Sequence, residues 1–342
     1  MSLKNLSAKI KIPKLLEEKL KNKRIYQIYK RFEKSINIKE NFIVAVSGGP
    51  DSLSLAFLSK IYSIKHHLVC KFYIIDHKLR PESTNEAKLV KKVLKKHFIK
   101  AEILTWQGRK PIKNIQSIAR EKRYELLLGK CTEFKINDIL LGHHQDDLIE
   151  NFFIRIFRGS GLKGLVSLDK KSKINNISLL RPLLDQKKED LLFLSQKVFN
   201  FYLQDPSNED EKYQRIKIKK LLEEFEKKGL DKEKFVKTIK NLKSSNSVVN
   251  FYVIKNLKKN TSFLNKNEKL ILNNDFFQQP HEVIFRSFSI AIKQVGKKYY
   301  SVRGKKLDKV ISNIKDNRLS KVTLGSCIIE KVNQTVIISK EY

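Results

Sequence analysis

Phe42-Ile-Val-Ala-Val46 runs directly into Ser47-Gly-Gly-Pro-Asp-Ser52, and this stretch decides the fold. The five apolar residues end abruptly at a pair of glycines, which predicts a buried strand that stops in a tight turn. Leu53, Ala56 and Phe57 follow at helical spacing, so a helix is predicted to begin at once. The pattern is therefore strand, turn and helix N-terminus.

The turn has the residue types of a phosphate-binding loop. Gly48 and Gly49 carry no Cβ, so the backbone can turn sharply and approach a ligand closely. Free N–H groups of the first helical turn then point at that ligand, which favours an anion. Pro50 suits the first turn of a helix, and Asp51 is a candidate magnesium ligand. A second interpretation stays open, because many such turns bind nothing and Ser47 would then be a simple N-cap.

The loop is not of the Walker A type, since no Gly-Lys-Ser/Thr follows the glycines. It resembles instead the SGGxDS signature of the PP-loop pyrophosphatases. Those enzymes split ATP between its α- and β-phosphates, adenylate a substrate and release pyrophosphate. The resemblance implies that ATP is bound by Ser47, Gly48, Gly49, Pro50, Asp51 and Ser52.

Composition indicates the class of partner. The 342 residues leave room for two or three domains, and a hydrophobic content of 41% suits globular folding. The net charge of +35, from 71 Lys and Arg against 36 Asp and Glu, predicts a polyanionic partner, nucleic acid in particular. The alternative is compositional bias, because the chain is rich in Lys, Ile and Asn.

Cysteine usage and hydropathy indicate the compartment. Cys70, Cys131 and Cys327 lie far apart and form no CxxC pair, so neither a zinc site nor an iron–sulfur site is predicted. No apolar run is long enough to span a bilayer, and the first residues lack the apolar core of a secretory signal. We expect a cytoplasmic protein with reduced thiols and no membrane association.

Strands and helices alternate after a basic helical lead-in at residues 1–40, which we expect to be peripheral. Strands are predicted at 42–46, 68–75, 101–105 and 138–141, each followed by a helical pattern, two of which cover 114–128 and 145–157. This alternation predicts an α/β fold with a doubly wound, mainly parallel sheet that is covered on both faces.

Three polar clusters follow the predicted strands: Ser47 to Ser52, Asp76-His77, and Gly142 to Asp147. Ligands of such sheets bind at the carboxyl ends of the strands, where all three clusters fall. Asp146 and Asp147 suit magnesium, which bridges substrate phosphates. Each cluster also has a structural interpretation: a turn for Asp76-His77, a favourable charge at the helix N-terminus for the two aspartates, and capping or packing for the histidines.

Arg120 and Arg123 lie near one another in a predicted helix. They are either solvated charges, or one of them neutralises the α-phosphate of ATP as it becomes pentacoordinate. A fixed guanidinium is better suited to that task than a mobile lysine.

A wider set of motifs resembles the tRNA(Ile)-lysidine synthases over residues 42 to about 215. Besides the loop, the motifs in family order are Asp76-His-Lys-Leu-Arg-Pro-Glu-Ser83, Ile118-Ala-Arg-Glu-Lys-Arg-Tyr124, Gly142-His-His-Gln-Asp-Asp147, Arg158-Gly-Ser-Gly161, Arg181-Pro-Leu-Leu184 and Asp205-Pro-Ser-Asn208. The family uses ATP and Mg2+ to adenylate the cytidine at the first anticodon position of a tRNA(Ile) with a CAU anticodon. Free L-lysine then displaces AMP and gives lysidine, which changes codon reading and charging from methionine to isoleucine.

The resemblance also implies roles for single residues. The loop Ser47 to Ser52 would hold the leaving pyrophosphate, and Asp51 and Asp147 would position Mg2+ or the lysine ammonium. Arg120 would stabilise charge in the transition state. His143 is the candidate for proton transfer, because an imidazole exchanges protons near neutral pH.

Two stretches depart from the family pattern. Asp146-Asp147-Leu148-Ile149-Glu150-Asn151 replaces the usual Asp-Asp-Gln-x-Glu-Thr, and Arg215-Ile-Lys-Ile-Lys219 replaces an arginine-rich run. Lys217 and Lys219 keep the positive charge but lose the bidentate fork of arginine. These changes bear on the positioning of tRNA rather than on the ATP site.

A polar break at 204–212 predicts the end of a catalytic domain at 41–210. Residues 214–295 are predicted to be helical, with Leu264 and Leu270 among their apolar positions. Their lysine-rich face is either solvated or binds tRNA.

The tail at 297–342 contains two β-rich runs, 322–329 and 334–338, which predict a small hairpin. It resembles the C-terminal region with which longer lysidine synthases bind tRNA.

Two other functions remain open. One is a related PP-loop enzyme, such as a cytidine thiolase or a small-metabolite synthetase, although thiolases of this kind generally use cysteine pairs and a small substrate leaves the charge of +35 unexplained. The other is a non-catalytic RNA-binding protein, which the intact loop disfavours. The family resemblance also allows a homodimer, for which no interface is evident in the sequence.

Overall fold

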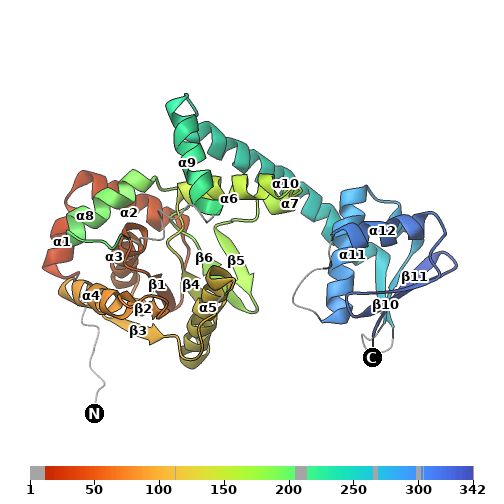
Figure 1. The fold of residues 1–342 in the computed structure, drawn as a ribbon, viewed down its shortest axis with the longest axis horizontal. Coiled ribbons are helices and arrows are strands. Elements are labelled where there is room, and N and C mark those ends of the chain that lie inside the picture. Colours follow the sequence, from red (N-terminus) through yellow and green to blue (C-terminus); the bar gives the residue numbers. More distant parts are fainter. Residues whose placement is uncertain are drawn as a thin grey trace, which may run out of the picture. The chain divides into compact units, whose positions relative to one another are not determined.

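The computed structural model describes residues 12–111, 113–204, 214–264, 269–297, 302 and 304–341. The chain forms two compact units, Met1–Lys237 and Thr238–Tyr342 (Figure 1). The first unit contains a mainly parallel sheet, and the second contains an antiparallel one.

A six-stranded sheet with the order β3-β2-β1-β4-β6-β5 forms the centre of the first unit. Its strands are β1 (Phe42–Val46), β2 (Cys70–Asp76), β3 (Ala101–Thr105), β4 (Asp138–Leu140), β5 (Lys171–Ile174) and β6 (Ile177–Leu180). β1 pairs in parallel with β2 and β4, and β5 pairs antiparallel with β6. The prediction of a mainly parallel sheet is confirmed. The β5–β6 hairpin was not predicted, because Lys171 and Lys173 interrupt any apolar run.

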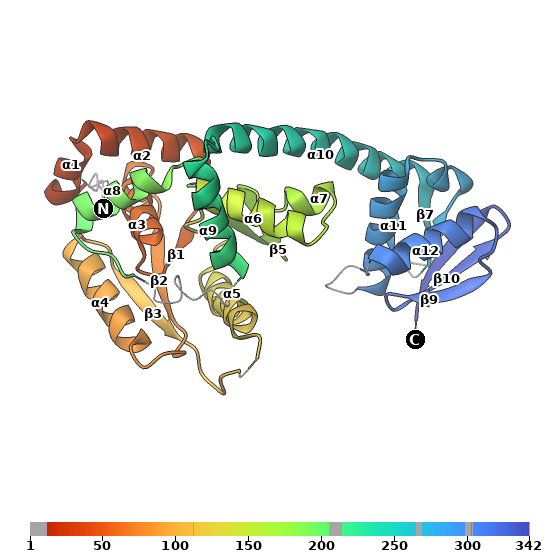
Figure 2. The ribbon, with the colours of Figure 1, turned by 45° about the horizontal axis from the view of Figure 1, so that its top comes forward.

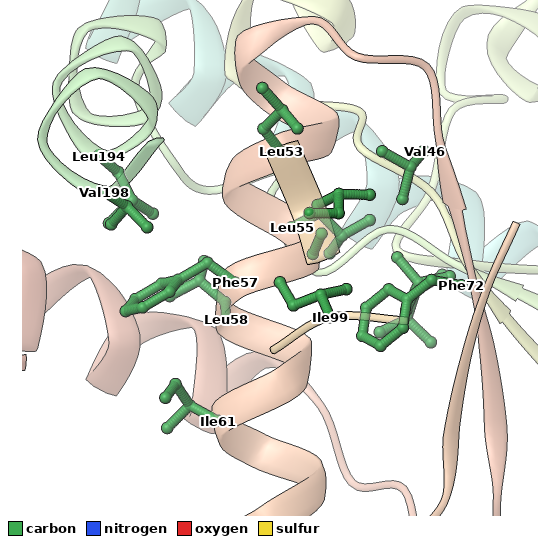
Figure 3. Packing of buried hydrophobic residues seen from close by; sticks show 14 of the residues in the cluster. Val46, Leu53, Leu55, Phe57, Leu58, Ile61, Phe72, Ile99, Leu194 and Val198 are labelled. Carbon is green, nitrogen blue, oxygen red and sulfur yellow. The ribbon is translucent and has the colours of Figure 1, made fainter. Parts of the chain in front are cut away.

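Helices cover both faces of this sheet because successive strand residues point to opposite sides. They are α3 (Pro50–Lys65), α4 (Ser83–Lys96), α5 (Ile115–Phe134), α6 (Gln145–Phe157), α7 (Leu162–Leu165) and α8 (Lys188–Phe199). Residues of α3 and α8 pack with Val46 and Phe72 in one hydrophobic cluster (Figure 3), to which α4 also contributes. Residues of α5 pack with Ile43 and Tyr73 in another. α6 has the bounds predicted for it.

The lead-in is part of the core, so the expectation that it is peripheral is wrong. It forms α1 (Lys14–Leu20) and α2 (Lys23–Ser35). Leu16, Ile28 and Phe32 are fully buried and belong to the same cluster as α3. The many lysines of this stretch hide an apolar stripe at helical spacing, and burial of that stripe attaches both helices to the sheet domain.

The unit boundary lies inside a helix rather than at the predicted polar break. α9 (Gln214–Lys227) packs on α6, and α10 (Lys232–Asn260) crosses the division at residues 237 and 238. The predicted break at 204–212 lies almost wholly outside the described residues.

The second unit is built on a five-stranded antiparallel sheet with the order β7-β8-β11-β10-β9. Its elements after α10 are β7 (Thr261–Leu264), β8 (Lys269–Leu272), the short helix η2 (Asn274–Phe277), α11 (His281–Gly296), α12 (Gly304–Lys315), β9 (Lys321–Leu324), β10 (Cys327–Val332) and β11 (Thr335–Lys340). Leu264 and Leu270 lie on strands, so the all-helical prediction for 214–295 is wrong there.

The predicted hairpin in the tail is confirmed as β10 and β11, and it is part of a larger sheet. The run predicted at 322–329 is two strands, because Gly325 and Ser326 both have positive φ and turn the chain between β9 and β10.

Candidate active site at the carboxyl ends of the parallel strands

The loop between β1 and α3 is held tightly by its surroundings. Gly48 has a φ of +91°, and a Cβ there would lie 2.5 Å from Val90 Cγ2 and 2.7 Å from Leu203 Cδ1. The Leu203 N–H donates to the Gly48 carbonyl at 2.9 Å. Only glycine fits this position, because both the backbone angle and the space exclude a side chain.

Ser52 organises the inside of the loop. Its hydroxyl accepts hydrogen bonds from the N–H groups of Ser47 and Gly48, at 3.1 and 3.0 Å, and donates to the Gly49 carbonyl at 3.0 Å. Gly49 is the N-cap of α3 and supplies no side-chain cap, and Pro50 occupies the first turn. The start of α3 therefore presents backbone N–H groups and the positive end of the helix dipole to the loop, which suits a phosphate.

Gly142 brings the cluster after β4 against this loop. A Cβ on Gly142 would lie 3.3 Å from the Asp51 carbonyl carbon and 3.3 Å from the Ser52 Cα. Two backbones therefore approach each other where β1 and β4 end side by side. The predicted meeting of the clusters Ser47 to Ser52 and Gly142 to Asp147 is confirmed.

His144 lies between the two carboxylates proposed from sequence. Its Nε2 is 3.6 Å from Asp51 Oδ2 and 3.6 Å from Asp147 Oδ2. Its Nδ1 accepts from the Asp146 N–H at 3.2 Å, which leaves Nε2 to carry the proton. The Asp147 carboxylate in turn accepts from the His144 N–H at 2.8 Å and completes a capping box at the start of α6.

Each carboxylate also has a cationic partner from a distant part of the chain. Lys188 Nζ donates to both oxygens of Asp51 at 2.7 Å. Arg215 contacts Asp147 through Nη2 and donates from Nε to Glu150 Oε2 at 2.6 Å. These pairs hold acidic side chains that are only 10–23% exposed.

Burial and charge act against each other on these acids. Burial raises the pKa of Asp147, but electrostatic interactions with His144, Arg215 and His143, together with the hydrogen bond from the His144 N–H, outweigh burial and hold the pKa below its usual value. Burial raises the pKa of Glu150, and Arg215 offsets that rise only in part. Asp147 is therefore the acid of this pair that is held ionised.

His143 is a neutral imidazole at the same edge. Burial, with help from the charges of Arg181, Arg120 and Arg215, lowers the pKa of His143 to about 4, although Asp147 acts in the opposite direction. Its Nδ1 is buried and has no hydrogen-bond partner among the described residues. Such an atom is available to a substrate proton.

Arg120 projects from α5 as an exposed side chain. It donates to the Tyr124 hydroxyl at 3.1 Å and lies over the Tyr124 ring at 5.2 Å from its centre. It is near enough to His143 for its charge to lower the pKa of that histidine.

Asp76 has a structural use. Its carboxylate accepts from Ser83 Oγ at 2.9 Å, Thr84 Oγ1 at 2.7 Å and the Lys78 N–H at 3.0 Å, which fixes the turn between β2 and α4. The turn interpretation of Asp76 is the one that these contacts support.

Four residues of this cluster escaped prediction as site residues: His144, Glu150, Lys188 and Arg215. Glu150 follows Asp147 by three residues, and helical spacing alone would place it on the same face. His144 was offered only as part of a histidine pair. The sequence contains no local signal for Lys188, which meets Asp51 across 137 positions.

The residues of the cluster fit ATP and Mg2+. The uncapped start of α3, reached through the turn that Gly48 makes with a φ of +91°, fits a pyrophosphate group. Mg2+ typically takes one or two carboxylates and completes its shell with phosphates and water. Asp51 and Asp147, both within 3.6 Å of one imidazole nitrogen, fit such an arrangement. Among the described residues, no group of three or more His, Cys, Asp or Glu side chains could hold a metal alone.

Comparison with known proteins places this geometry in a family. A family model described as a PP-loop domain matches residues 18–225. The tRNA(Ile)-lysidine synthase of Wolbachia pipientis wMel is 31% identical over 302 residues, which cover 87% of this chain and 70% of that protein. The enzyme of the same name from Orientia tsutsugamushi (strain Boryong) is 34% identical over 313 residues, which cover 87% and 69%.

A solved structure has a similar fold at lower identity. The U34-tRNA thiolase NcsA from Methanococcus maripaludis, with its 4Fe-4S cluster, matches with a TM-score of 0.55 at 17% identity, covering 64% of this chain and 78% of that one. None of the described helices has the length and apolar character needed to cross a membrane. The signature loop, the matched PP-loop domain and the coverage of the relatives together establish that this chain belongs to the tRNA(Ile)-lysidine synthase family.

Proposed function

We propose that this protein ligates L-lysine to C2 of the cytidine at the first anticodon position of a tRNA(Ile) with a CAU anticodon, and converts ATP to AMP and pyrophosphate. The observation that carries the proposal is the meeting of Asp51 and Asp147 at His144, beside an anion-binding loop. The family membership supports the choice of tRNA and lysine as substrates.

The first step activates the cytidine. Its O2 attacks the α-phosphorus of ATP, a new P–O bond forms, and the bond to the β-phosphate breaks. The loop from Ser47 to Ser52 binds the leaving pyrophosphate through backbone N–H groups. Asp51 and Asp147 would hold Mg2+, which would supply positive charge against the phosphates, and Arg120 stabilises the charge that develops on the α-phosphate.

The second step transfers lysine. The amine nitrogen bonds to C2 of the cytidine, the bond from C2 to the AMP oxygen breaks, and the nitrogen loses a proton. His143 accepts that proton, because its imidazole is neutral and its Nδ1 has no partner among the described residues. The acidic pair of Asp147 and Glu150 attracts the lysine ammonium before the reaction.

The thiolase alternative is less well supported by the side chains present. Cys70, Cys131 and Cys327, all described by the structure, form no disulfide; Cys131 and Cys327 are buried, and burial raises the pKa of Cys70. The similarity to the thiolase NcsA lies in the fold and does not extend to cysteine ligands in the described residues.

Incorporation of labelled lysine into a CAU-anticodon tRNA(Ile) transcript, with ATP and Mg2+, tests the proposal. Asp147→Asn should lower incorporation by at least about 100-fold, since the variant loses the ionised carboxylate at the reacting groups. Asp146→Asn is the matched control. That neighbouring side chain contacts Lys232 instead of His144, so activity should change little.

The outcomes separate the alternatives. Incorporation by the wild type that spares a methionine tRNA supports the reaction and its selectivity. AMP release that depends on tRNA but transfers no lysine would mean that another nucleophile is used. Binding of tRNA without any ATP turnover would favour a non-catalytic protein. A cytoplasmic location and a homodimer, which the family resemblance allows, belong to the same proposal, and sedimentation tests the dimer.

A further inference from the structure

The outer face of α10 exposes large apolar side chains. Val248, Phe251, Tyr252 and Ile254 are 56%, 62%, 48% and 54% exposed. They occupy consecutive turns of one continuous helix (Figure 2). Single exposed apolar residues need no explanation, but a cluster of four with two aromatic rings indicates a binding surface.

Contacts on the opposite face of α10 fix the orientation of the helix about its own axis. Asn246 and Asn250 accept hydrogen bonds from Arg286 Nη1 at 2.7 and 3.0 Å. Asn256 is 3% exposed and donates to the Phe276 carbonyl, and Val253 is 2% exposed. These contacts belong to the core of the second unit. At 3.6 residues per turn they place Phe251 on the side that faces away from that core.

The exposed face is strongly basic. α10 contains eight lysines and a single acidic residue, Glu233. Lys255 and Lys258 follow Phe251 by four and seven residues, so they lie on the same face, and both are exposed. A second copy of this face would bring lysines against lysines, which disfavours self-association. The lysines favour a polyanion, and the exposed aromatic rings favour flat apolar groups. Unpaired RNA has both, in its phosphates and its bases.

We propose that this face binds an unpaired segment of the substrate RNA, with bases stacked on Phe251 and Tyr252 and adjacent phosphates on Lys255 and Lys258. The two rings meet edge to face, 5.5 Å between centres and 85° between planes, so they offer two differently oriented surfaces. A duplex hides its base faces, so stacking requires unpaired nucleotides. The inference rests on the proposed function only where it identifies the RNA as tRNA.

Equilibrium binding of the full chain to a labelled tRNA with a CAU anticodon tests this proposal. Phe251→Leu keeps an apolar side chain and helix propensity but removes the π-face, and should weaken binding about tenfold, within the range for one stacked base. Lys255→Gln should reduce the slope of log affinity against log salt by about 0.7, whereas Phe251→Leu should leave that slope unchanged. Phe263→Leu is the matched control, because it makes the same substitution at an exposed ring on β7, outside this face, and should bind like the wild type.

The proposal is overturned if Phe251→Leu binds tRNA as the wild type does. It is equally overturned if the variant loses the same affinity for a fully paired RNA duplex, because the contact would then not be stacking. Self-association of the wild type that Phe251→Leu abolishes would assign the face to a protein interface instead.

Lysine incorporation separates this inference from the proposed function. Phe251→Leu should raise KM for tRNA and leave kcat unchanged. If the wild type binds tRNA as described but incorporates no lysine, the proposed function is wrong and the proposed RNA-binding surface still stands. If the wild type incorporates lysine and Phe251→Leu does not alter the KM for tRNA, only the proposed RNA-binding surface is wrong.

Discussion

Paired charges hold the site together at the scale of single residues. Asp51 and Asp147 share one imidazole, and each has a cation of its own, Lys188 or Arg215. Two carboxylates near each other repel, and that repulsion would disfavour the ionised forms that bind cations. The two cations therefore offset that repulsion and hold the two carboxylates in place.

Two half-buried histidines, His77 and His143, make folding stability depend on pH. Burial, assisted by Arg123, lowers the pKa of His77 to about 4, and His143 is shifted to about the same value. Between pH 4 and about 6.5 the unfolded chain binds more protons at these positions than the folded chain. The free energy of unfolding therefore rises with pH through that window, by up to about 1.4 kcal/mol per pH unit for each histidine.

Urea unfolding of the wild type and His77→Gln from pH 4.5 to 7.5 measures this effect. The variant should lose less stability than the wild type as the pH falls, because its side chain does not titrate. Parallel curves for the two proteins would contradict a depressed pKa at His77.

The turn between β1 and α3 is the element on which the site depends. Gly48→Ala forces a side chain into positive φ and into contact with Val90 and Leu203, so we expect a loss of about 2 kcal/mol or more and no nucleotide binding. Gly49→Ala is the matched control. Its φ is −71°, and its nearest neighbour would be Ser47 Oγ at 3.9 Å, so the loss should be at most about 1 kcal/mol.

Thermal unfolding with and without ATP distinguishes the two variants. Gly49→Ala should keep a shift in Tm on adding ATP, and Gly48→Ala should show none. Equal behaviour of the two variants would mean that the loop conformation does not determine nucleotide binding.

Elements that are determined by neighbouring residues in the sequence could be predicted. Contacts between residues far apart in the sequence could not. β1, α6 and the loop follow from apolar periodicity and two glycines, all within a few residues of one another. The partners of the carboxylates do not: Arg215 reaches Asp147 across 68 positions and Lys188 reaches Asp51 across 137. Their side chains resemble any other surface cation in a chain with 71 Lys and Arg.

Among the described residues, the two compact units bury separate sets of apolar side chains, with two clusters in the first unit and one in the second. The first includes the lead-in helices, with Phe32 fully buried beside α3, and the second gathers α11, α12 and the antiparallel sheet around Phe288. Each core buries its own set of apolar side chains, so each unit has its own source of stability. Basic composition masked the burial of the lead-in helices, because lysines are interspersed among their buried apolar residues.

Independent cores predict independent unfolding. Phe32→Ala and Phe288→Ala each remove a fully buried ring, so each should cost its own unit about 3–5 kcal/mol. Differential scanning calorimetry should show that Phe32→Ala lowers the transition of the sheet unit and Phe288→Ala lowers that of the second unit. Each variant serves as the control for the other. If either substitution shifts both transitions equally, α10 joins the units into one cooperative structure. If Phe32→Ala shifts neither transition, the lead-in helices do not stabilise the catalytic domain.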